Sequence, residues 1–252
     1  MQNLSIAFPQ KTEVEKQRIA KDFYHLFIDT FVETIKLISI SKKTFLKHIE
    51  FDGSLLATLS AKQQNIQMHS GHFFNYEFMN FASAFHLQNN WLGVYAPIGN
   101  KAFDKIMYDM RAKFGTILIA NKDFRNKFHT YSKQPYTLGL AADQNPHNPN
   151  NAFWINFFGI KTAFVKGPEK GAKNQNAAVV MVYIRQIKRG YYKLETTLLT
   201  TTPNETPEGF ITKALVNFIE DKVKQYPANY LWSHKRWKHK YDAAKYGHLA
   251  VN

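Results

Sequence analysis

Residues 67–77 read QMHSGHFFNYE, and this stretch decides the fold. The apolar residues at its start predict a short strand over residues 65–70, and Gly71 allows the chain to turn sharply where that strand ends. Asn75 is a good N-cap, so a helix is predicted from there to about residue 87. A strand, a tight turn and a helix in this order are typical of an α/β sheet.

The same stretch places a histidine and a glutamate five positions apart. In a continuous helix these side chains would point ~140° apart, so His72 and Glu77 can meet only if the chain turns between them. Glu77 falls in the first turn of the predicted helix, where the backbone dipole favours a carboxylate. We therefore expect Glu77 to reach one nitrogen of the His72 imidazole, fix its tautomer and leave the other nitrogen free as a base. Such a pair suits the activation of a hydroxyl.

Short apolar runs alternate with amphipathic segments along the rest of the chain. Strands are predicted over residues 91–95, 116–120 and 136–141, helices over residues 101–114 and 122–132, a hairpin over residues 177–185 and 191–199, and a late helix over residues 208–225. The alternation predicts an α/β fold in a single domain, with a mainly parallel central sheet flanked by helices. Because sites gather at the carboxyl ends of parallel strands, we expect His72 and Asp143 to share one crevice.

The first part of the chain is predicted to be helical. Thr12 and Glu15 have the spacing of a capping box and open a helix that runs to about residue 37. This helix either packs on the core or lies next to a membrane, and two shorter helices follow over residues 41–47 and 53–62. We divide the single domain into an N-terminal helical segment (1–63), an α/β core (64–226) and a basic aromatic tail (227–252).

Composition narrows the classes of protein to consider. Of the 252 residues, 44% are hydrophobic, which is enough for a substantial core. The sequence has no cysteine, so disulfides, thiolate metal sites and a cysteine nucleophile are excluded. It contains neither an apolar run of ~18 residues nor a signal peptide. The net charge of +14 indicates an acidic partner, which can be nucleic acid, anionic lipid or an acidic protein.

Metal and nucleotide sites are not expected. His69 lies three residues before His72, but no further residue completes the spacing of a zinc site. Gly159, Gly167 and Gly171 do not form a phosphate-binding loop. We therefore predict no metal and no cofactor.

The tail interleaves lysine and arginine with aromatic residues. This composition suits the headgroup region of a bilayer, and it equally suits single-stranded nucleic acid, whose bases stack on aromatic rings. Candidate membrane or headgroup contacts are Trp232, Arg236, Trp237 and Lys238.

The motif from His72 to Glu77 resembles the His-four-residues-acid motif of membrane acyltransferases, in the form used by bacterial lipid A late acyltransferases. Further blocks resemble that family in the same order: residues 94–97 (VYAP), residues 103–106 (FDKI) with Arg111 and Gly115, residues 139–144 (GLAADQ), residues 156–159 (NFFG) with Thr162 and residues 167–168, and residues 230–238 (YLWSHKRWK). The resemblance covers nearly the whole chain. It departs from the family pattern at Ala96, where a basic residue is common, and at Phe74 and Tyr76, which replace a glycine and a tryptophan.

The resemblance implies a glycerolphosphate-acyltransferase-like fold and the transfer of a fatty acyl chain from an acyl carrier protein thioester to a hydroxyl of a lipid A precursor. It implies His72 and Glu77 as catalytic residues and Arg111 as a contact to substrate phosphate. Asp143 and Gln144 would position the acceptor sugar or hold the loop that carries His72, and Asn75 is a further candidate for substrate binding.

The resemblance also implies a location at the cytoplasmic face of the bacterial inner membrane. The family has a membrane helix before a segment like residues 3–9, so we expect that anchor to be missing here and the protein to be peripheral. Alternatives are coenzyme A as the donor, a lysophospholipid, aminolipid or glycolipid as the acceptor, a catalytically silent relative, or a basic nucleic-acid-binding protein. The chain lacks a nucleic-acid-binding motif, so nucleic acid is not an expected partner.

Overall fold

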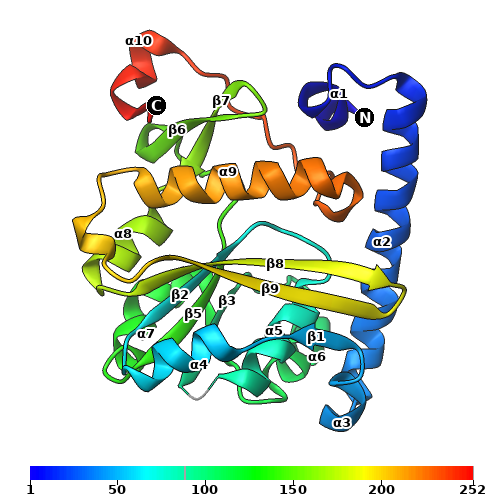
Figure 1. Cartoon of the computed structure of the whole chain (residues 1–252), viewed down its shortest axis with the longest axis vertical. Coiled ribbons are helices and arrows are strands. Elements are labelled where there is room, and N and C mark those ends of the chain that lie inside the picture. Colours follow the sequence, from blue (N-terminus) through cyan, green and yellow to red (C-terminus); the bar gives the residue numbers. More distant parts are fainter. Residues whose placement is uncertain (88, 252) are drawn as a thin grey trace.

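A seven-stranded sheet forms the centre of the protein (Figure 1). The structure is a computed structural model that describes residues 1–87 and 89–251. Gln88 and Asn252, the last residue of the predicted tail, lie outside the described residues. The strands, in their order across the sheet, are β1 (Ile49–Phe51), β9 (Tyr191–Thr200), β8 (Ala178–Lys188), β2 (Ile66–Ser70), β5 (Tyr136–Ala141), β3 (Asn90–Tyr95) and β4 (Ile117–Ala120). Neighbouring strands are parallel except β8 and β9, which form the predicted hairpin. The predicted single-domain α/β fold with a mainly parallel sheet is confirmed.

Helices cover both faces of this sheet (Figure 1). Helix α9 packs over β2 and β8, while α5 contacts β1, β3 and β9 from the other side. The helices are α1 (Gln2–Ala7), α2 (Glu13–Ser39), α3 (Lys42–Phe45), α4 (Ser54–Ala61), α5 (Tyr76–His86), α6 (Lys101–Ala112), α7 (Phe124–Tyr131), α8 (Gly167–Asn174), α9 (Phe210–Gln225) and α10 (Ala243–Tyr246). Short 3-10 turns are η1 (Asn121–Asp123), η2 (Pro149–Asn151), η3 (Pro203–Glu205), η4 (Pro227–Asn229) and η5 (Gly247–Leu249). Among the described residues, no helix combines the length and the apolar character needed to cross a membrane.

The stretch at residues 66–86 folds as predicted. Every residue of β2 is buried, because the strand lies in the middle of the sheet between β8 and β5. Helix α5 starts after Asn75, whose side-chain oxygen accepts a hydrogen bond from the backbone NH of Glu77 at 3.0 Å. This cap satisfies one of the free NH groups at the start of the helix. The tight connection therefore holds His72 between a fixed strand and a fixed helix.

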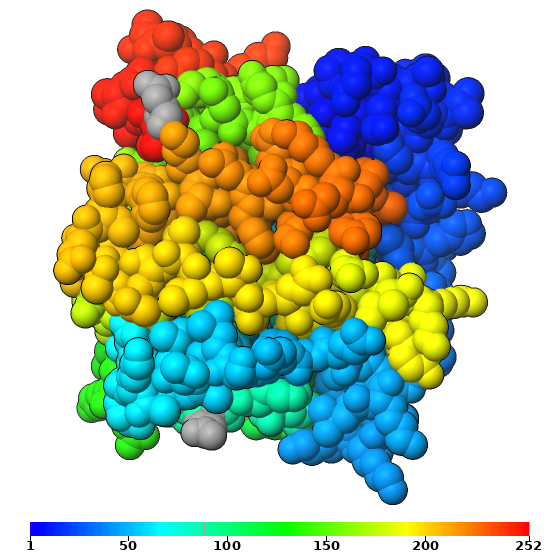
Figure 2. Space-filling model, in the orientation of Figure 1, coloured from blue at the N-terminus to red at the C-terminus, as the bar shows by residue number. Residues whose placement is uncertain are grey.

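Three strands were not predicted. β1 is a three-residue strand inside the segment that we expected to be helical, and it pairs with β9. β6 (Ala152–Phe157) and β7 (Ile160–Val165) form a separate antiparallel pair. Figure 2 shows this pair between the C-terminal segment and the N-terminal helices at one end of the molecule. Trp154 of β6 forms a bridge with Ala250, and Asn3 donates hydrogen bonds to the backbone oxygens of Trp232 and His234.

The chain after α9 is built into the core. Tyr230 bridges to Phe73, and the backbone NH of Leu231 donates to the His72 oxygen at 3.1 Å. The prediction of a headgroup-binding surface is therefore wrong for two of its four residues, Trp232 and Arg236, which are buried, whereas Trp237 is half-buried. Trp232 is 8% exposed and Arg236 is 1% exposed, and the indole nitrogen of Trp237 is buried, whereas Lys238 is exposed. The Arg236 guanidinium lies 3.9 Å from the centre of the Phe164 ring, so cation and ring pack together inside the protein.

Candidate active site

Two neighbouring parallel strands bring His72 and Asp143 together. β2 and β5 pair in register, with Ser70 opposite Ala141, and the backbone NH of Ala142 donates to the Ser70 oxygen at 3.0 Å. Each strand ends there, and two residues later the chain carries a histidine on one side and an aspartate on the other. The predicted proximity of these two residues at the carboxyl ends of their strands is thus explained by the register of the strands.

Asp143 binds His72 through both carboxylate oxygens. Oδ1 lies 2.5 Å from the ring nitrogen Nδ1, and Oδ2 accepts the His72 backbone NH at 3.1 Å. A carboxylate accepts hydrogen bonds, so Nδ1 carries the proton in this pair and Nε2 is the free nitrogen of the neutral ring. Nε2 lies 3.3 Å from the side-chain nitrogen of Gln144. The His72 side chain is 24% exposed.

The two groups shift each other's pKa. Burial lowers the pKa of His72, but the charge and the hydrogen bond of Asp143 outweigh it, so the net pKa is raised above the usual 6.5. Burial tends to raise the pKa of Asp143. The positive charge and hydrogen bonds of His72, with a smaller contribution from Arg236, lower it to about 2. Asp143 is therefore ionised at neutral pH and favours a protonated ring whenever His72 takes up a proton.

Glu77 does not take the place that the sequence suggested. We expected its carboxylate at the His72 ring, but Asp143 occupies Nδ1 and Glu77 pairs with Arg111 of α6. Arg111 Nε donates to both Glu77 oxygens at 2.9 and 3.1 Å, and Nη2 donates to Oε1 at 2.6 Å. Glu77 is 2% exposed, so this is a buried ion pair that joins the first turn of α5 to the last turn of α6.

Asn75 stands between these two ends of the motif and is fully buried. Its oxygen caps α5, and its side-chain NH2 donates to Glu33 of α2 at 2.9 Å. Glu33 also accepts a hydrogen bond from the Tyr192 hydroxyl at 2.6 Å. Both ends of the Asn75 amide are thus used inside the protein, which gives this residue a structural role in place of the predicted substrate contact.

Three residues around Asp143 were not predicted as site residues, namely Tyr230, Asn145 and His234, and a fourth, Arg236, was predicted only as a headgroup contact. Tyr230 is buried beside Asp143, and burial, followed by the negative charge of Asp143, raises the pKa of its hydroxyl well above 10. Nε2 of His234 lies 3.2 Å from the backbone nitrogen of Asn145 and 3.1 Å from its side-chain nitrogen. The side-chain oxygen of Asn145 accepts a hydrogen bond from Arg236 at 2.8 Å. The signal was present in residues 230–238, but its aromatic and basic composition was interpreted as a membrane contact.

His69 lies in the interior of the protein. It is 1% exposed, and its Nε2 lies 2.9 Å from the side chain of Gln67. Burial lowers the pKa of His69 to about 4, so the ring is neutral. In residues 1–87 and 89–251, no three acidic, histidine or cysteine side chains are grouped so that they could hold a metal ion.

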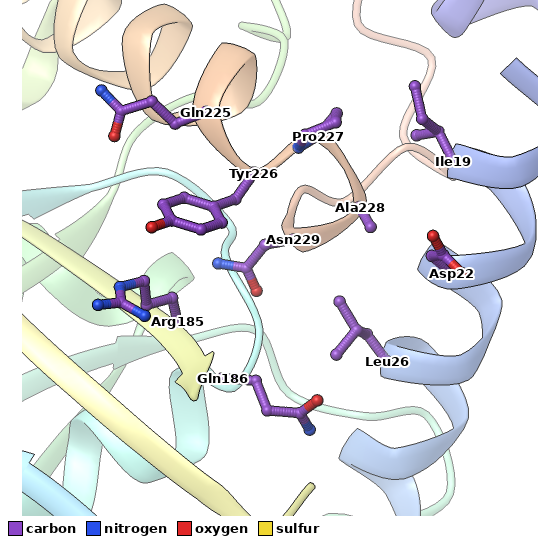
Figure 3. Close-up of a pocket in the computed structure, with 10 residues that line it drawn as sticks. All are labelled: Ile19, Asp22, Leu26, Arg185, Gln186, Gln225, Tyr226, Pro227, Ala228 and Asn229. Atoms are coloured by element: carbon purple, nitrogen blue, oxygen red, sulfur yellow. The ribbon is translucent and has the colours of Figure 1, made fainter. Parts of the chain in front are cut away.

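A cavity of about 300 Å³ lies between α2, the end of β8 and the η4 turn (Figure 3). It sits at the carboxyl end of β8, next to the strand that leads to His72, and Asn229 on its wall accepts the backbone NH of Phe74 at 3.4 Å. Its lining residues are Ile19, Asp22, Leu26, Arg185, Gln186, Gln225, Tyr226, Pro227, Ala228 and Asn229. His72 is not among the residues that line this cavity, and Phe73 and Phe74, which follow it in the motif, are buried.

An α/β sheet with a carboxylate-held histidine at the carboxyl ends of its strands defines a class of site in which an imidazole can take a proton from a bound hydroxyl. Residues 1–239 match the family described as bacterial lipid A biosynthesis acyltransferase, so the chain belongs to that family. This confirms the resemblance found in the sequence. The family's activity is acyl transfer in lipid A biosynthesis, which implies a lipid acceptor. A comparison with curated proteins found no match.

Proposed function

We propose that this protein transfers a fatty acyl chain from an acyl carrier protein thioester to a hydroxyl of a lipid A precursor, with His72 as the general base. One observation carries the proposal: Asp143 binds Nδ1 of a partly exposed His72 ring, and the only hydrogen-bonding neighbour of Nε2 among the described residues is the exposed side chain of Gln144. The family supplies the reaction class, and the geometry supports the residue that performs it.

The reaction proceeds by direct acyl transfer. His72 Nε2 removes the proton from the acceptor hydroxyl as the oxygen attacks the thioester carbonyl carbon. The carbon–sulfur bond of the resulting tetrahedral species then breaks, and the thiolate receives the proton back from the imidazolium. Asp143 stabilises this imidazolium, because a carboxylate 2.5 Å from Nδ1 favours the charged ring. The step needs no acyl-enzyme and no cofactor.

Gln144 and Arg111 are assigned to the substrates. The Gln144 side-chain nitrogen lies 3.3 Å from His72 Nε2, where an acceptor hydroxyl or the developing oxyanion would be bound. Two guanidinium nitrogens of Arg111 donate to Glu77, and the third, Nη1, which makes no hydrogen bond within the described residues, is assigned to a substrate phosphate. A general base supplies ~10²–10⁴-fold of the rate enhancement. An oxyanion donor supplies about another 10²–10³-fold.

Glu77 is assigned an indirect catalytic role through Arg111. The buried carboxylate orients the guanidinium and joins α5 to α6, so the start of α5 and the motif before it are held in place. The ion pair thus connects the helix that follows His72 to Arg111, the residue assigned to substrate phosphate.

The charge of the protein suits this donor and location. A net charge of +14 complements an acidic acyl carrier protein and anionic lipid headgroups at the cytoplasmic face of the inner membrane. The protein would act there as a peripheral enzyme, and mass spectrometry of lipids from a deletion strain would show lipid A that lacks one acyl chain. An unchanged lipid A together with an altered phospholipid or glycolipid would contradict the proposed acceptor.

Replacing His72 by Ala tests the mechanism. We expect turnover of a radiolabelled acyl donor to fall by ~10²–10⁴-fold, because the base is lost. The matched control is His129→Ala, an exposed histidine on α7, which should leave turnover unchanged. Far-ultraviolet circular dichroism and thermal unfolding would show that both variants fold. Undiminished turnover in the folded His72→Ala variant would dismiss His72 as the base.

A further inference from the structure

The second half of α2 has apolar side chains on the face turned away from the protein. The exposed residues are Tyr24, Ile28, Phe31, Val32, Ile35 and Ile38, whose exposed fractions run from 42% to 68%. At ~100° per residue, their positions fall within a sector of about 120° on the helix. Figure 1 shows α2 along one edge of the molecule. Single exposed apolar residues are ordinary, but a continuous row on one helix marks an interaction surface.

The charges around this row are positive. Between residues 24 and 47 the carboxylates are Asp29 and Glu33, and both are already engaged. Asp29 pairs with Arg189 at 2.7 Å, while the buried Glu33 accepts hydrogen bonds from other elements. The same segment carries exposed lysines at Lys36, Lys42, Lys43 and Lys47, and the half-exposed Leu46 lies among them.

We propose that the outer face of α2, defined by these six apolar residues, docks on a bilayer that contains anionic lipids. The helix would lie in the plane of the interface with its apolar row among the acyl chains and with the lysines of α2 and α3 at the headgroups. A convex helix face with an apolar row and a lysine border has the character of an interfacial helix. Anionic headgroups complement the lysines, and each lysine near such a surface adds to binding.

The inner face of the same helix contacts the motif. The Phe23 and Phe27 rings lie 5.7 and 6.0 Å from the Phe74 ring, and Glu33 accepts the hydrogen bond from Asn75. A helix with its side chains is ~10–12 Å thick, so a bilayer on the outer face lies about one helix diameter from the residues that follow His72. The docking surface therefore holds the site close to the source of a lipid acceptor. This step rests on the proposed function, whereas bilayer binding itself does not.

Vesicle flotation tests the proposal with the full chain. The wild-type protein should float with phosphatidylglycerol–phosphatidylethanolamine vesicles. The variant Ile28→Gln/Phe31→Gln/Ile35→Gln should bind at least ~100-fold more weakly, because three apolar side chains no longer leave water. The control Ile160→Gln/Leu198→Gln/Phe210→Gln changes side chains of 41–43% exposure on other elements and should bind like wild type.

A second variant separates charge from apolar contact. Lys36→Gln/Lys43→Gln/Lys47→Gln should bind anionic vesicles roughly fivefold more weakly per lysine and bind phosphatidylcholine vesicles like wild type. Lys62→Gln/Lys133→Gln/Lys170→Gln is the control with the same change of net charge at exposed sites elsewhere. Equal weakening in both lysine variants would show that total charge, and not this face, binds the membrane, and would overturn the proposal.

Two further results would also overturn it. One is unchanged flotation of the apolar variant. The other is a wild-type dimer in solution that the apolar variant converts to a monomer while vesicle binding persists, since the row would then bind a second copy of the chain. Turnover of a detergent-dispersed acceptor does not need a bilayer, so measuring it separates the proposed docking surface from the proposed catalytic function. The apolar variant should retain that turnover, whereas His72→Ala should lose it and still float. A wild-type protein that floats but transfers no acyl chain would contradict the proposed function alone.

Discussion

The two ends of the motif at residues 72–77 have opposite environments. His72 is partly exposed and binds a carboxylate from the loop after β5, whereas Glu77 is buried and binds a guanidinium from α6. The two residues are five positions apart, but the binding partner of His72 lies 71 positions from it in the sequence and that of Glu77 lies 34 positions from it. The difference teaches that the spacing of such a motif need not create a contact between its own two ends. In the proposed mechanism one end provides the general base, whereas the other end joins α5 to α6 through an ion pair.

The largest expected effect is at the partner of His72. Asp143→Asn removes the charge that stabilises the imidazolium and disturbs the choice of tautomer, so kcat/KM should fall by about 10²–10⁴-fold. Steady-state acyl transfer would measure this. Asp109→Asn, the same change on the exposed side of α6, should have no effect. Full activity of a folded Asp143→Asn variant would contradict the claim that Asp143 supports His72 as the base.

At the other end, the main expected effect is on stability. Arg111→Met leaves the Glu77 carboxylate buried without its partner, which costs about 3–5 kcal/mol of the free energy of unfolding. Glu77→Gln/Arg111→Met should recover part of that loss, because no buried charge remains. Urea unfolding would measure both variants beside Arg125→Met, a control at an exposed arginine of α7. An Arg111→Met variant as stable as the wild type would contradict the claim that the buried Glu77 carboxylate depends on its ion pair with Arg111.

The smallest expected effect is at the residue between the two ends. Asn75→Ala removes the cap of α5 and the hydrogen bond to Glu33, and should lower the free energy of unfolding by about 2 kcal/mol. Asn75→Ser retains a capping oxygen and should lose about half as much. Thermal or urea unfolding distinguishes these values. Equal stability of the Ala and Ser variants would mean that the cap contributes nothing.

Local sequence patterns predicted the elements that carry the site. β2, α5 and the Asn75 cap follow from short-range rules of burial, turning and capping, and the proximity of His72 and Asp143 follows from the order of parallel strands. These patterns did not predict that Asp143, and not Glu77, binds the His72 ring. The choice between two carboxylates depends on where α6 places Arg111, which is set by packing between elements distant in sequence.

The tail shows a second limit of sequence reasoning. Tryptophan and arginine near one another occur at membrane surfaces, but the same residues also pack in cores when a ring and a guanidinium stack. Arg236 lies over Phe164, and Trp237 stacks on Phe157 with ring centres 5.7 Å apart. Composition cannot separate these cases, because burial is decided by the β6–β7 pair, which was not predicted. The three-residue β1 was missed for a similar reason: its pairing with β9 is a long-range contact.

The pH dependence of kcat/KM tests most directly which carboxylate serves His72. The base works only when deprotonated, so activity falls below the pKa of His72, which Asp143 raises. Removing that charge lowers the pKa, so Asp143→Asn should shift the acidic limb of the profile to lower pH. Glu77→Gln should leave the limb where it is in the wild-type enzyme. A limb that moves in Glu77→Gln and stays fixed in Asp143→Asn would contradict the account.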